Sequence, residues 1–380
     1  MVTPVDLEVA AQIRRRGPLP FDEVIERALY DPVDGFFGGG AGAGRRADFL
    51  TSPEVGPLFG AVLARALDQW WVELGRPDPF TVIEAAAGSG TLARSVLAAG
   101  PDCAGALTYV LVERSEALRD RQREHLPIGD PALAYPPSED EDIDGPSTET
   151  GLGPRVVSLG ELPTLAVTGV VLANELLDNL VFRLLERGDA GWLEVRVALT
   201  GDDLPLVELT VPAEEADARL ADRLAPDAVV GARLPRQRAA AEWLAQALGL
   251  IERGRVVVLD YGADSRELAG RPPVEWIRTY RAHERGAAPL DDLGAQDITC
   301  EVAFDQLGHV RVPDADRPQA EFLRDHGLGE LVADGRRVWT ERAHLGDLEA
   351  IRARSRIGEA EALTDPAGLG AFHVLEWIVP

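Results

Sequence analysis

Apolar runs of strand length alternate with amphipathic stretches through most of the chain. The strand-length runs lie at 81–85, 109–113, 155–158, 169–173 and 255–260. Stretches with helical spacing of apolar residues follow several of these runs, at 91–99, 115–125 and 175–180. Strands that alternate with helices usually form a parallel sheet covered on both faces. The pattern therefore predicts an α/β fold with a mostly parallel sheet.

Two segments interrupt this alternation. Residues 136–154 are rich in proline, glycine and acids and contain no base, which predicts a disordered acidic surface loop; the alternative is a docking strip for a basic partner. Within 181–250, two alternating runs are joined by the polar turn Gly201-Asp-Asp203, which is typical of a hairpin. We expect an N-terminal helical and lid segment at 1–75, an α/β core at 76–180 and 251–380, and an inserted α+β lobe at 181–250.

The most informative motif is a strand, a turn of small residues and a helix within 81–94. The strand ends in Glu84, and the turn contains Gly88 and Gly90, which let a ligand approach the backbone closely. Such a unit holds a nucleotide-like cofactor at the edge of a parallel sheet. The next strand ends in Glu113, whose carboxylate can accept hydrogen bonds from both hydroxyls of a ribose.

The acid that precedes the turn indicates which cofactor the turn binds. A carboxylate at Glu84 would repel a pyrophosphate, whereas it would attract the amino group and the sulfonium of S-adenosylmethionine (SAM). We therefore expect SAM and not a nicotinamide dinucleotide. In the alternative interpretation, Glu84 is a solvated strand end, and Gly88 and Gly90 only form a tight turn.

Composition narrows the class of partner. Lysine and arginine total 38 against 64 acids, a formal net charge of −26 that disfavours nucleic acid or an anionic membrane but suits an arginine-rich protein segment. Neither the 2 cysteines nor the 6 histidines show the spacing of metal ligands, so we expect no metal site. The sequence shows no signal peptide and no spanning run, so we expect no membrane insertion and a cytoplasmic protein.

Six blocks follow one another along the chain. They are Ala28–Pro32 with Gly35-Phe36, Asp48–Glu54 with Phe59-Gly60, the turn 84–92 with Val112–Ser115, Ala173–Asp178, Asp260–Gly262, and Arg278–Arg281 with Asp297–Thr299. Each block is short, but together and in this order they resemble the MidA family of SAM-dependent methyltransferases. The resemblance covers about residues 17–310.

The resemblance implies a Rossmann-like methyltransferase fold, with a mostly parallel sheet of the seven-stranded type and an inserted substrate lobe. It also implies SAM as cofactor and methylation of an arginine in a protein substrate, by family analogy a respiratory complex subunit. The cofactor-binding residues are then Glu84, Ala86, Gly88, Gly90, Glu113, Asp48, Thr51 and Ser52. The segment with the last three would fold over the cofactor as a lid, although Pro53 in a first helical turn also explains it as a helix start.

Methylation of arginine sets a chemical requirement. A guanidinium stays protonated because its pKa exceeds ~12, so carboxylates must clamp it and help to remove a proton. Asn174, Glu175 and Asp178 follow a buried-looking strand and should lie at its carboxyl end, where open α/β sheets bind ligands. These three are the candidate catalytic residues, and the two acids share one face if 175–180 is helical. Alternatively, Asn174 is only a helix cap, followed by two acids in the first turn.

The chain departs from the family pattern at four positions. Ala86 replaces the first glycine of the turn, Ala47 replaces another glycine, Val181 replaces a proline, and Glu301 stands where many relatives carry histidine. A methyl group on Ala86 would crowd the turn or the ligand, and Glu301 suggests a different substrate. Two other functions stay open: an assembly factor with a SAM fold that binds a partner without turnover, and a small-molecule methyltransferase.

Overall fold

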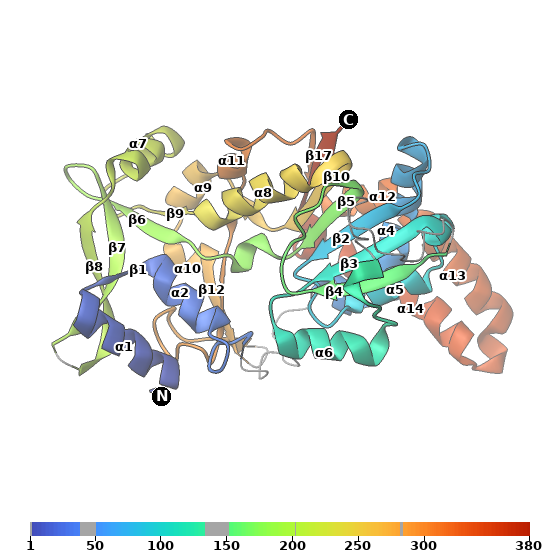
Figure 1. Cartoon of the computed structure of the whole chain (residues 1–380), viewed down its shortest axis with the longest axis horizontal. Helices are drawn as coiled ribbons and strands as arrows, with labels where there is room; N and C mark the ends of the chain where they lie inside the picture. The colour runs from blue at the N-terminus through green and yellow to red at the C-terminus, as the bar shows by residue number, and fades with distance from the viewer. Residues whose placement is uncertain (1, 39–50, 134–151, 202, 282–283) are drawn as a thin grey trace, which may run out of the picture. The chain divides into compact units, whose positions relative to one another are not determined.

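The computed structural model describes residues 2–38, 51–133, 152–201, 203–281 and 284–380 (Figure 1). Internal contacts divide the chain into two compact units. The first unit comprises Met1–Phe49, Leu176–Gln246 and Tyr261–Val312, and the second comprises Leu50–Glu175, Ala247–Asp260 and Pro313–Pro380. Residues 261–312, which we expected in the core with the cofactor site, thus belong to the first unit.

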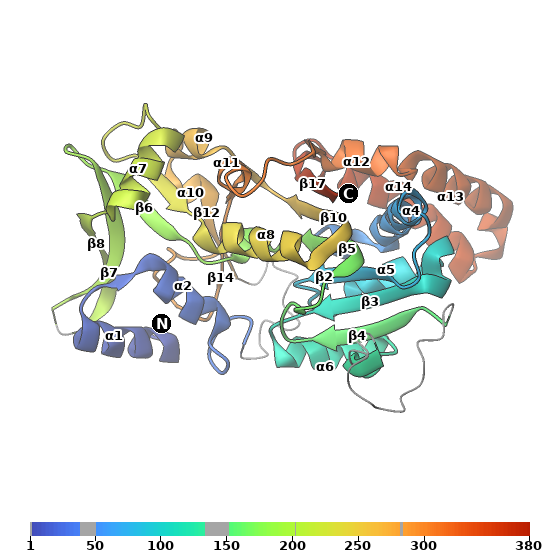
Figure 2. The same cartoon turned by 45° about the horizontal axis from the view of Figure 1, so that its top comes forward.

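A sheet of seven strands forms the centre of the second unit (Figures 1 and 2). In pairing order, the strands are β16 (Ala315–Pro318), β17 (His373–Val379), β10 (Ile251–Asp260), β5 (Val167–Asn174), β2 (Phe80–Ala85), β3 (Leu107–Val112) and β4 (Arg155–Leu159). The strands from β10 to β4 run parallel, whereas β17 is antiparallel to both of its neighbours. Every residue of β2 and β3 is buried, which explains their nearly continuous apolar runs.

Helices accompany the sheet in the second unit (Figure 2). They are α3 (Ser52–Val55), α4 (Pro57–Glu73), α5 (Thr91–Ala98), α6 (Glu116–His125), α12 (Gln319–Asp325), α13 (Leu328–Arg342) and α14 (Leu348–Leu363), with 3-10 turns at Asp102–Ala106, Pro131–Leu133, Ala343–Leu345 and Leu369–Ala371. Helices α4 and α5 approach closely, since a Cβ added to Gly60 would lie 2.4 Å from the Cβ of Ser95. Helix α14 packs against α13, α3 and α4, so a C-terminal helix contacts the first two helices of this unit.

The first unit combines small sheets with short helices. Its strands are β1 (Leu19–Pro20), β6 (Arg183–Arg187), β7 (Trp192–Thr200), β8 (Asp203–Pro212), β9 (Arg233–Arg236), β11 (Gly262–Ala263), β12 (Ile277–Arg281), β13 (Glu284–Arg285), β14 (Asp297–Cys300) and β15 (Val302–Ala303). Its helices are α1 (Pro4–Arg16), α2 (Phe21–Tyr30), α7 (Glu215–Leu224), α9 (Ser265–Ala269), α10 (Pro273–Trp276) and α11 (Phe304–Gly308). Helix α8 (Arg238–Leu250) begins in the first unit and ends in the second.

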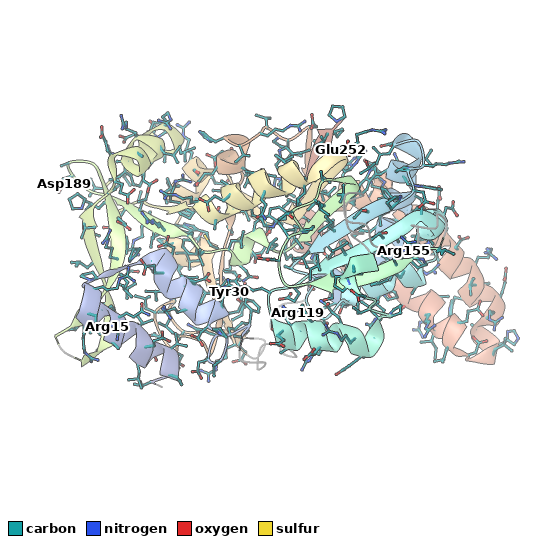
Figure 3. All side chains as sticks on the ribbon, viewed as in Figure 1. Arg15, Tyr30, Arg119, Arg155, Asp189 and Glu252 are labelled. Carbon is teal, nitrogen blue, oxygen red and sulfur yellow. The ribbon has the colours of Figure 1, made fainter. Side chains whose placement is uncertain are left out.

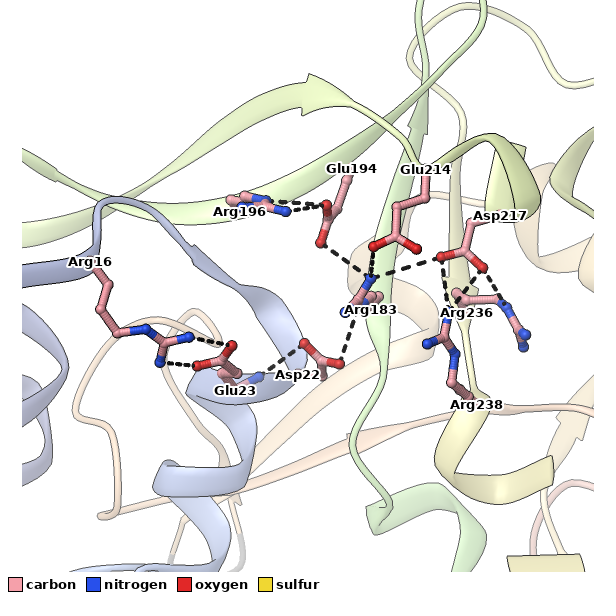
Figure 4. A network of polar contacts seen from close by, with 10 residues as sticks. All are labelled: Arg16, Asp22, Glu23, Arg183, Glu194, Arg196, Glu214, Asp217, Arg236 and Arg238. Carbon is pink, nitrogen blue, oxygen red and sulfur yellow. Dashed lines mark hydrogen bonds and ion pairs between the residues drawn. The ribbon is translucent and has the colours of Figure 1, made fainter. Parts of the chain in front are cut away.

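Apolar packing and ion pairs hold the first unit together. Phe21 of α2 packs on Phe182, with ring centroids 5.6 Å apart. The Arg183 guanidinium lies 3.2 Å from carboxylate oxygens of Asp22 and Glu214, and 3.9 Å from those of Glu194 and Asp217; Figure 4 draws these contacts as dashed lines. Burial disfavours the charge of Arg183, but these carboxylates outweigh that cost and raise its pKa. The network therefore links α2, β6, β7 and α7 of this unit.

Several predicted elements are confirmed. The predicted hairpin is the antiparallel pair β7 and β8. The strands and helices predicted around the glycine turn appear as β2, α5, β3 and α6. Most of the predicted acidic loop 136–154 lies outside the described residues.

The helix predicted at 175–180 is wrong. Strand β5 ends at Asn174, and only the 3-10 turn Leu177–Asn179 follows. Glu175 has a φ of 51°, in the left-handed region, and its N–H donates to the carbonyl of Leu259 at 2.8 Å. A left-handed residue cannot continue into a right-handed helix, so the chain turns sharply at Glu175 instead.

Candidate functional site

The glycine turn joins β2 to α5 through three left-handed residues. Ala86, Gly88 and Gly90 have φ values of 54°, 55° and 80°. A Cβ added to Gly90 would lie 2.7 Å from a methyl carbon of Leu126, so the Leu126 side chain would have to move, and the left-handed φ itself favours glycine there. Ala86 adopts the conformation that a glycine would take at no steric cost. The turn is thus formed with alanine at this position.

Glu113 follows β3 and is held against the glycine turn. Its buried carboxylate accepts hydrogen bonds from the Gly88 N–H and from the Ser115 N–H, both at 2.9 Å and on different oxygens. Each carboxylate oxygen can accept a second hydrogen bond, so capacity remains for the hydroxyls of a ribose. The arrangement fits the adenosine part of SAM at this turn.

Polar side chains fix the two loops that carry this site. The Gln122 side chain is fully buried, donates to the Gly88 carbonyl at 2.7 Å, and accepts from the Ser158 hydroxyl at 2.6 Å. Arg119, labelled in Figure 3, donates to the main-chain carbonyl of Glu113 at 2.7 Å. These contacts set the position of the turn relative to β3 and β4 before any ligand arrives.

Glu84 is buried, so it is not a solvated strand end. Only 4% of the residue is exposed, and its carboxylate accepts a hydrogen bond from the Tyr109 hydroxyl at 2.7 Å. Burial and the Glu84 charge together raise the pKa of Tyr109 well above its ordinary value, so the phenol stays a donor. The alternative interpretation of Glu84 is therefore excluded, while its contact with the cofactor stays a prediction.

Asn174 and Glu175 meet Ser52 at the carboxyl end of β5. One oxygen of the half-buried Glu175 carboxylate accepts from the Asn174 side-chain amide at 3.1 Å and from the Ser52 main-chain N–H at 3.2 Å. The Oδ1 atom of Asn174 is buried, without a hydrogen-bond partner in the described part of the chain. Non-glycine residues with left-handed φ, such as Glu175, concentrate at functional sites. Two predicted catalytic residues and one predicted cofactor residue thus form one cluster.

Asp178 belongs to the first unit and has its own set of contacts. It is buried, and its Oδ2 lies 2.9 Å from the Tyr261 hydroxyl, which is also 2.9 Å from the Thr299 hydroxyl. The Arg278 guanidinium lies 5.6 Å from the centre of the Tyr261 ring. The next residue, Asn179, is also held in place: the hydroxyl of Tyr30, which is labelled in Figure 3, donates to the Asn179 carbonyl at 2.9 Å.

The lid residues divide into described and undescribed positions. Asp48 lies outside the described residues, and Thr51 immediately precedes α3. The Ser52 side chain is fully buried and donates to the Gln319 side chain at 2.9 Å. Sequence reasoning missed Gln319, because it lies 267 residues from Ser52 and carries no motif of its own.

Glu301, which departs from the family pattern, is an ion-pair partner inside the first unit. The buried carboxylate accepts from Arg271 at 2.5 Å and from Arg278 at 2.7 Å. Burial opposes the charge of Arg271, but its hydrogen bond to Glu301 and the charge of that carboxylate raise its pKa. Glu301 therefore pairs with two arginines of the same unit. Among the described residues, no group of three or more metal-ligating side chains gathers at any place.

The sequence is similar to a family of methyltransferases and to mitochondrial protein arginine methyltransferases. The model of a family described as S-adenosyl-L-methionine-dependent methyltransferases matches residues 62–316. The mitochondrial protein arginine methyltransferase NDUFAF7 homolog of Drosophila melanogaster is 27% identical over 320 residues, which cover 80% of this chain and 69% of the fly protein. Human mitochondrial protein arginine methyltransferase NDUFAF7 is 25% identical, and the match covers 80% of this chain and 68% of the human protein.

Two crystal structures of Burkholderia thailandensis proteins are similar over nearly the whole chain. One contains bound S-adenosyl-homocysteine; it is 28% identical, has a TM-score of 0.79, and the match covers 99% of this chain and 92% of that chain. The other is a native structure with 27% identity, a TM-score of 0.78, and coverage of 99% and 91%. An α/β methyltransferase-like fold with a mixed sheet is therefore shown for this chain.

The expectation of a cytoplasmic protein is wrong. The similar proteins of the fly, the zebrafish and humans are named as mitochondrial. The expectation rested on the lack of an apolar N-terminal run. Proteins of several aqueous compartments lack such a run, so it does not identify one compartment. Within the described ranges, no helix combines the length and the apolarity needed to cross a bilayer.

Proposed function

The chain belongs to the MidA-like family of SAM-dependent methyltransferases, and we propose that it transfers the methyl group to an arginine of a protein substrate. One observation carries the proposal. Strands β2 and β5 are parallel neighbours in which Ala85 pairs with Ala173, so the glycine turn and the Asn174–Glu175 pair leave the sheet side by side. A donor held by the turn would lie beside a carboxylate at the carboxyl edge of the sheet, where α/β enzymes bind ligands.

The cofactor-binding residues follow from this arrangement. In our proposal, Glu113 accepts hydrogen bonds from the ribose hydroxyls, and Gly88 and Gly90 allow the backbone to approach the adenosine. Ala86 lies in the same turn, and Glu84 contributes negative charge near the cationic end of SAM. Asp48, Thr51 and Ser52 border the site from the segment before α4.

The carboxylates prepare the acceptor. SAM, when bound, would supply an electrophilic methyl group on a sulfonium, whose S–CH₃ bond breaks to leave S-adenosyl-homocysteine. Glu175 accepts a hydrogen bond from the substrate guanidinium, orients one of its nitrogens, and takes up the proton that this nitrogen loses as the N–CH₃ bond forms. Asn174 holds the Glu175 carboxylate in place, and its buried Oδ1 is a further acceptor for a guanidinium N–H. Asp178, whose carboxylate lies 2.9 Å from the Tyr261 hydroxyl, is the second proposed catalytic acid.

The finer description of the fold is also part of the proposal. We interpret the parallel strands β10, β5, β2, β3 and β4 with their helices as a Rossmann-like core. The inserted residues of 181–250 then form the substrate lobe. The net charge of −26 favours association with an arginine-rich segment, which supports a protein substrate over an acidic metabolite.

Conservative variants of the two acids test the proposed roles. Glu175→Gln and Asp178→Asn keep the size of each side chain but remove its charge, so methyl transfer should fall at least about 100-fold. The rate is measured as tritium transferred from labelled SAM to a soluble protein extract of host cells that lack the gene. Affinity for S-adenosyl-homocysteine, measured by calorimetry, should stay within about threefold, because neither acid is proposed to bind the adenosine. Retained transfer in Glu175→Gln would refute the clamp.

The alternative of an assembly factor without turnover has one observation in its favour. Ala86 places a methyl group in the turn where the family pattern has glycine, and its left-handed φ shows that the backbone has not changed to relieve it. This alternative predicts partner binding by a wild-type protein that transfers no methyl group in the same assay. Transfer of label that is lost in Glu175→Gln would exclude it.

A further inference from the structure

One contact with the candidate catalytic pair, and the side chain that anchors this contact, come from outside the residues matched by the family model, 62–316. Ser52 precedes that range and Gln319 follows it, and both lie in the second unit with Asn174 and Glu175. We propose that the main-chain N–H of Ser52 is a positioning group for the Glu175 carboxylate, and that Gln319 holds Ser52 for this purpose. This inference rests on the proposed function, because it assigns the support of the same carboxylate.

A chain of hydrogen bonds connects the C-terminal helices to Glu175. The Gln319 side chain is fully buried; its amide donates to the Leu363 carbonyl of α14 at 3.2 Å, and its oxygen accepts from the Ser52 hydroxyl at 2.9 Å. The N–H of the same Ser52 donates to the Glu175 carboxylate at 3.2 Å. Ser52 therefore uses its side chain for anchorage and its backbone for the acid.

The position of Ser52 explains why its N–H is available. Ser52 is the first residue of α3, and the first N–H groups of a helix have no acceptor within that helix. An outward-facing N–H at a helix start is a natural donor for a carboxylate. Here, the carboxylate is supplied by a residue 123 positions away in the sequence, on the strand β5 side of the unit.

A second contact from α14 fixes the neighbouring helix in the same manner. The buried Glu359 carboxylate accepts from the Leu58 N–H at the start of α4 at 2.9 Å, and from the Ser355 hydroxyl at 2.6 Å. A Cβ added to Gly56 would lie 2.4 Å from the Glu359 carboxyl carbon, so the chain between α3 and α4 lies directly on this side chain. Helices α12 and α14 thus hold both sides of the short segment that presents the Ser52 N–H.

This support acts on the orientation of Glu175. Its backbone is in the left-handed region, where a glutamate is held only by its surroundings. Donors from Asn174 and Ser52 to one carboxylate oxygen restrict the side chain and favour its charged form. The carboxylate is then held in a defined direction, as a base for the guanidinium must be.

A variant that lacks only the main-chain N–H of residue 52 can test the proposal. Ser52→Pro removes the N–H at a helix position that suits proline, and Thr51 already has the extended conformation (φ −78°, ψ 156°) that a residue before proline needs. Ser52→Ala is the matched control, because it removes the same hydroxyl but keeps the N–H. Methyl transfer from tritiated SAM to the host extract is measured over pH 5 to 9 on the full chain.

We expect Ser52→Pro to transfer methyl groups at least about tenfold more slowly than Ser52→Ala, with equal affinity for S-adenosyl-homocysteine. Its acid-side half-maximal pH should also lie above that of Ser52→Ala, because loss of a donor makes a carboxylate easier to protonate. Equal rates and equal pH profiles in the two variants would overturn the inference. Retained transfer in Glu175→Gln would instead overturn the proposed function, so the two failures are distinguishable.

Gln319→Leu is the second variant and does not depend on proline being accepted. It removes both hydrogen bonds of Gln319 while keeping a buried side chain of similar size. We expect a slower rate and the same upward shift of the acid limb, and a crystal structure in which the Ser52 nitrogen has moved beyond 3.5 Å from the Glu175 carboxylate. An unmoved Ser52 with an unchanged pH profile would show that Gln319 has no positioning role.

Discussion

Ala86 is a single residue of the glycine turn whose backbone conformation is strained. The turn after β2 needs a left-handed residue at this position, and the structure places alanine there with a φ of 54°. The Cβ of an L-residue in this region is too close to the following carbonyl, which costs about 1–2 kcal/mol. The turn keeps its shape because Gly88, Glu113 and Gln122 fix it from the other side.

Substitution of this alanine by glycine should stabilise the protein. Ala86→Gly relieves the strain, but glycine also makes the unfolded chain more flexible, which lowers the free energy of unfolding by about 0.4–1 kcal/mol. We expect the free energy of unfolding to rise by about 0.5–1 kcal/mol in urea titrations. The matched control is Ala333→Gly on the exposed face of α13, which should lower the same quantity by about 1 kcal/mol. A decrease in stability for Ala86→Gly would contradict the strained conformation.

At the scale of elements, the C-terminal helices contain a buried histidine at the junction of α12 and α13. His326 is 7% exposed, and its ring centre lies 4.5 Å from that of Phe322 and 5.7 Å from that of Trp70. Neither ring nitrogen has a hydrogen-bond partner among the residues described. Burial lowers the pKa of His326, and so do the charges of Arg317 and Arg255, although Glu376 and Asp325 act in the opposite direction.

This histidine should make the second unit sensitive to acid. The pKa of His326 is lower in the folded than in the unfolded state. Its contribution to the free energy of unfolding is therefore fully present above the ordinary pKa of 6.5 and is lost as the pH falls below that value. His326→Phe should remove this dependence. Between pH 7.5 and 5, the wild type should lose stability relative to the variant, by up to about 1.4 kcal/mol per pH unit below 6.5. A constant stability difference across this range would show that His326 is not held neutral.

The whole molecule shows which features a sequence pattern can reveal. The strands and helices around the glycine turn were predictable because a fully buried parallel strand must be apolar and a tight turn must be small. Glu113 was predictable as the acid that ends the neighbouring strand, and it lies against Gly88 in the structure. These features depend on residues close together in the sequence.

Features that depend on distant residues were not predictable. The sharp turn at Glu175 is stabilised by Leu259 of β10, so local spacing suggested a helix where none exists. Gln319 reaches Ser52 only because α12 folds back onto the start of the second unit. The burial of Glu84 required knowledge that Tyr109 of the adjacent strand donates to it. In each case, a tertiary contact decided the role of a residue whose local sequence permitted another.

The chemical identity of the methylated side chain tests the proposed arginine methylation most directly. Purified wild-type protein is incubated with methyl-labelled SAM and an extract of host cells that lack the gene, and the labelled proteins are hydrolysed to amino acids. We expect the label to elute as methylarginine and to be absent when Glu175→Gln replaces the wild type. Label recovered on another amino acid, or on a small molecule in the soluble fraction, would contradict the assignment of an arginine substrate.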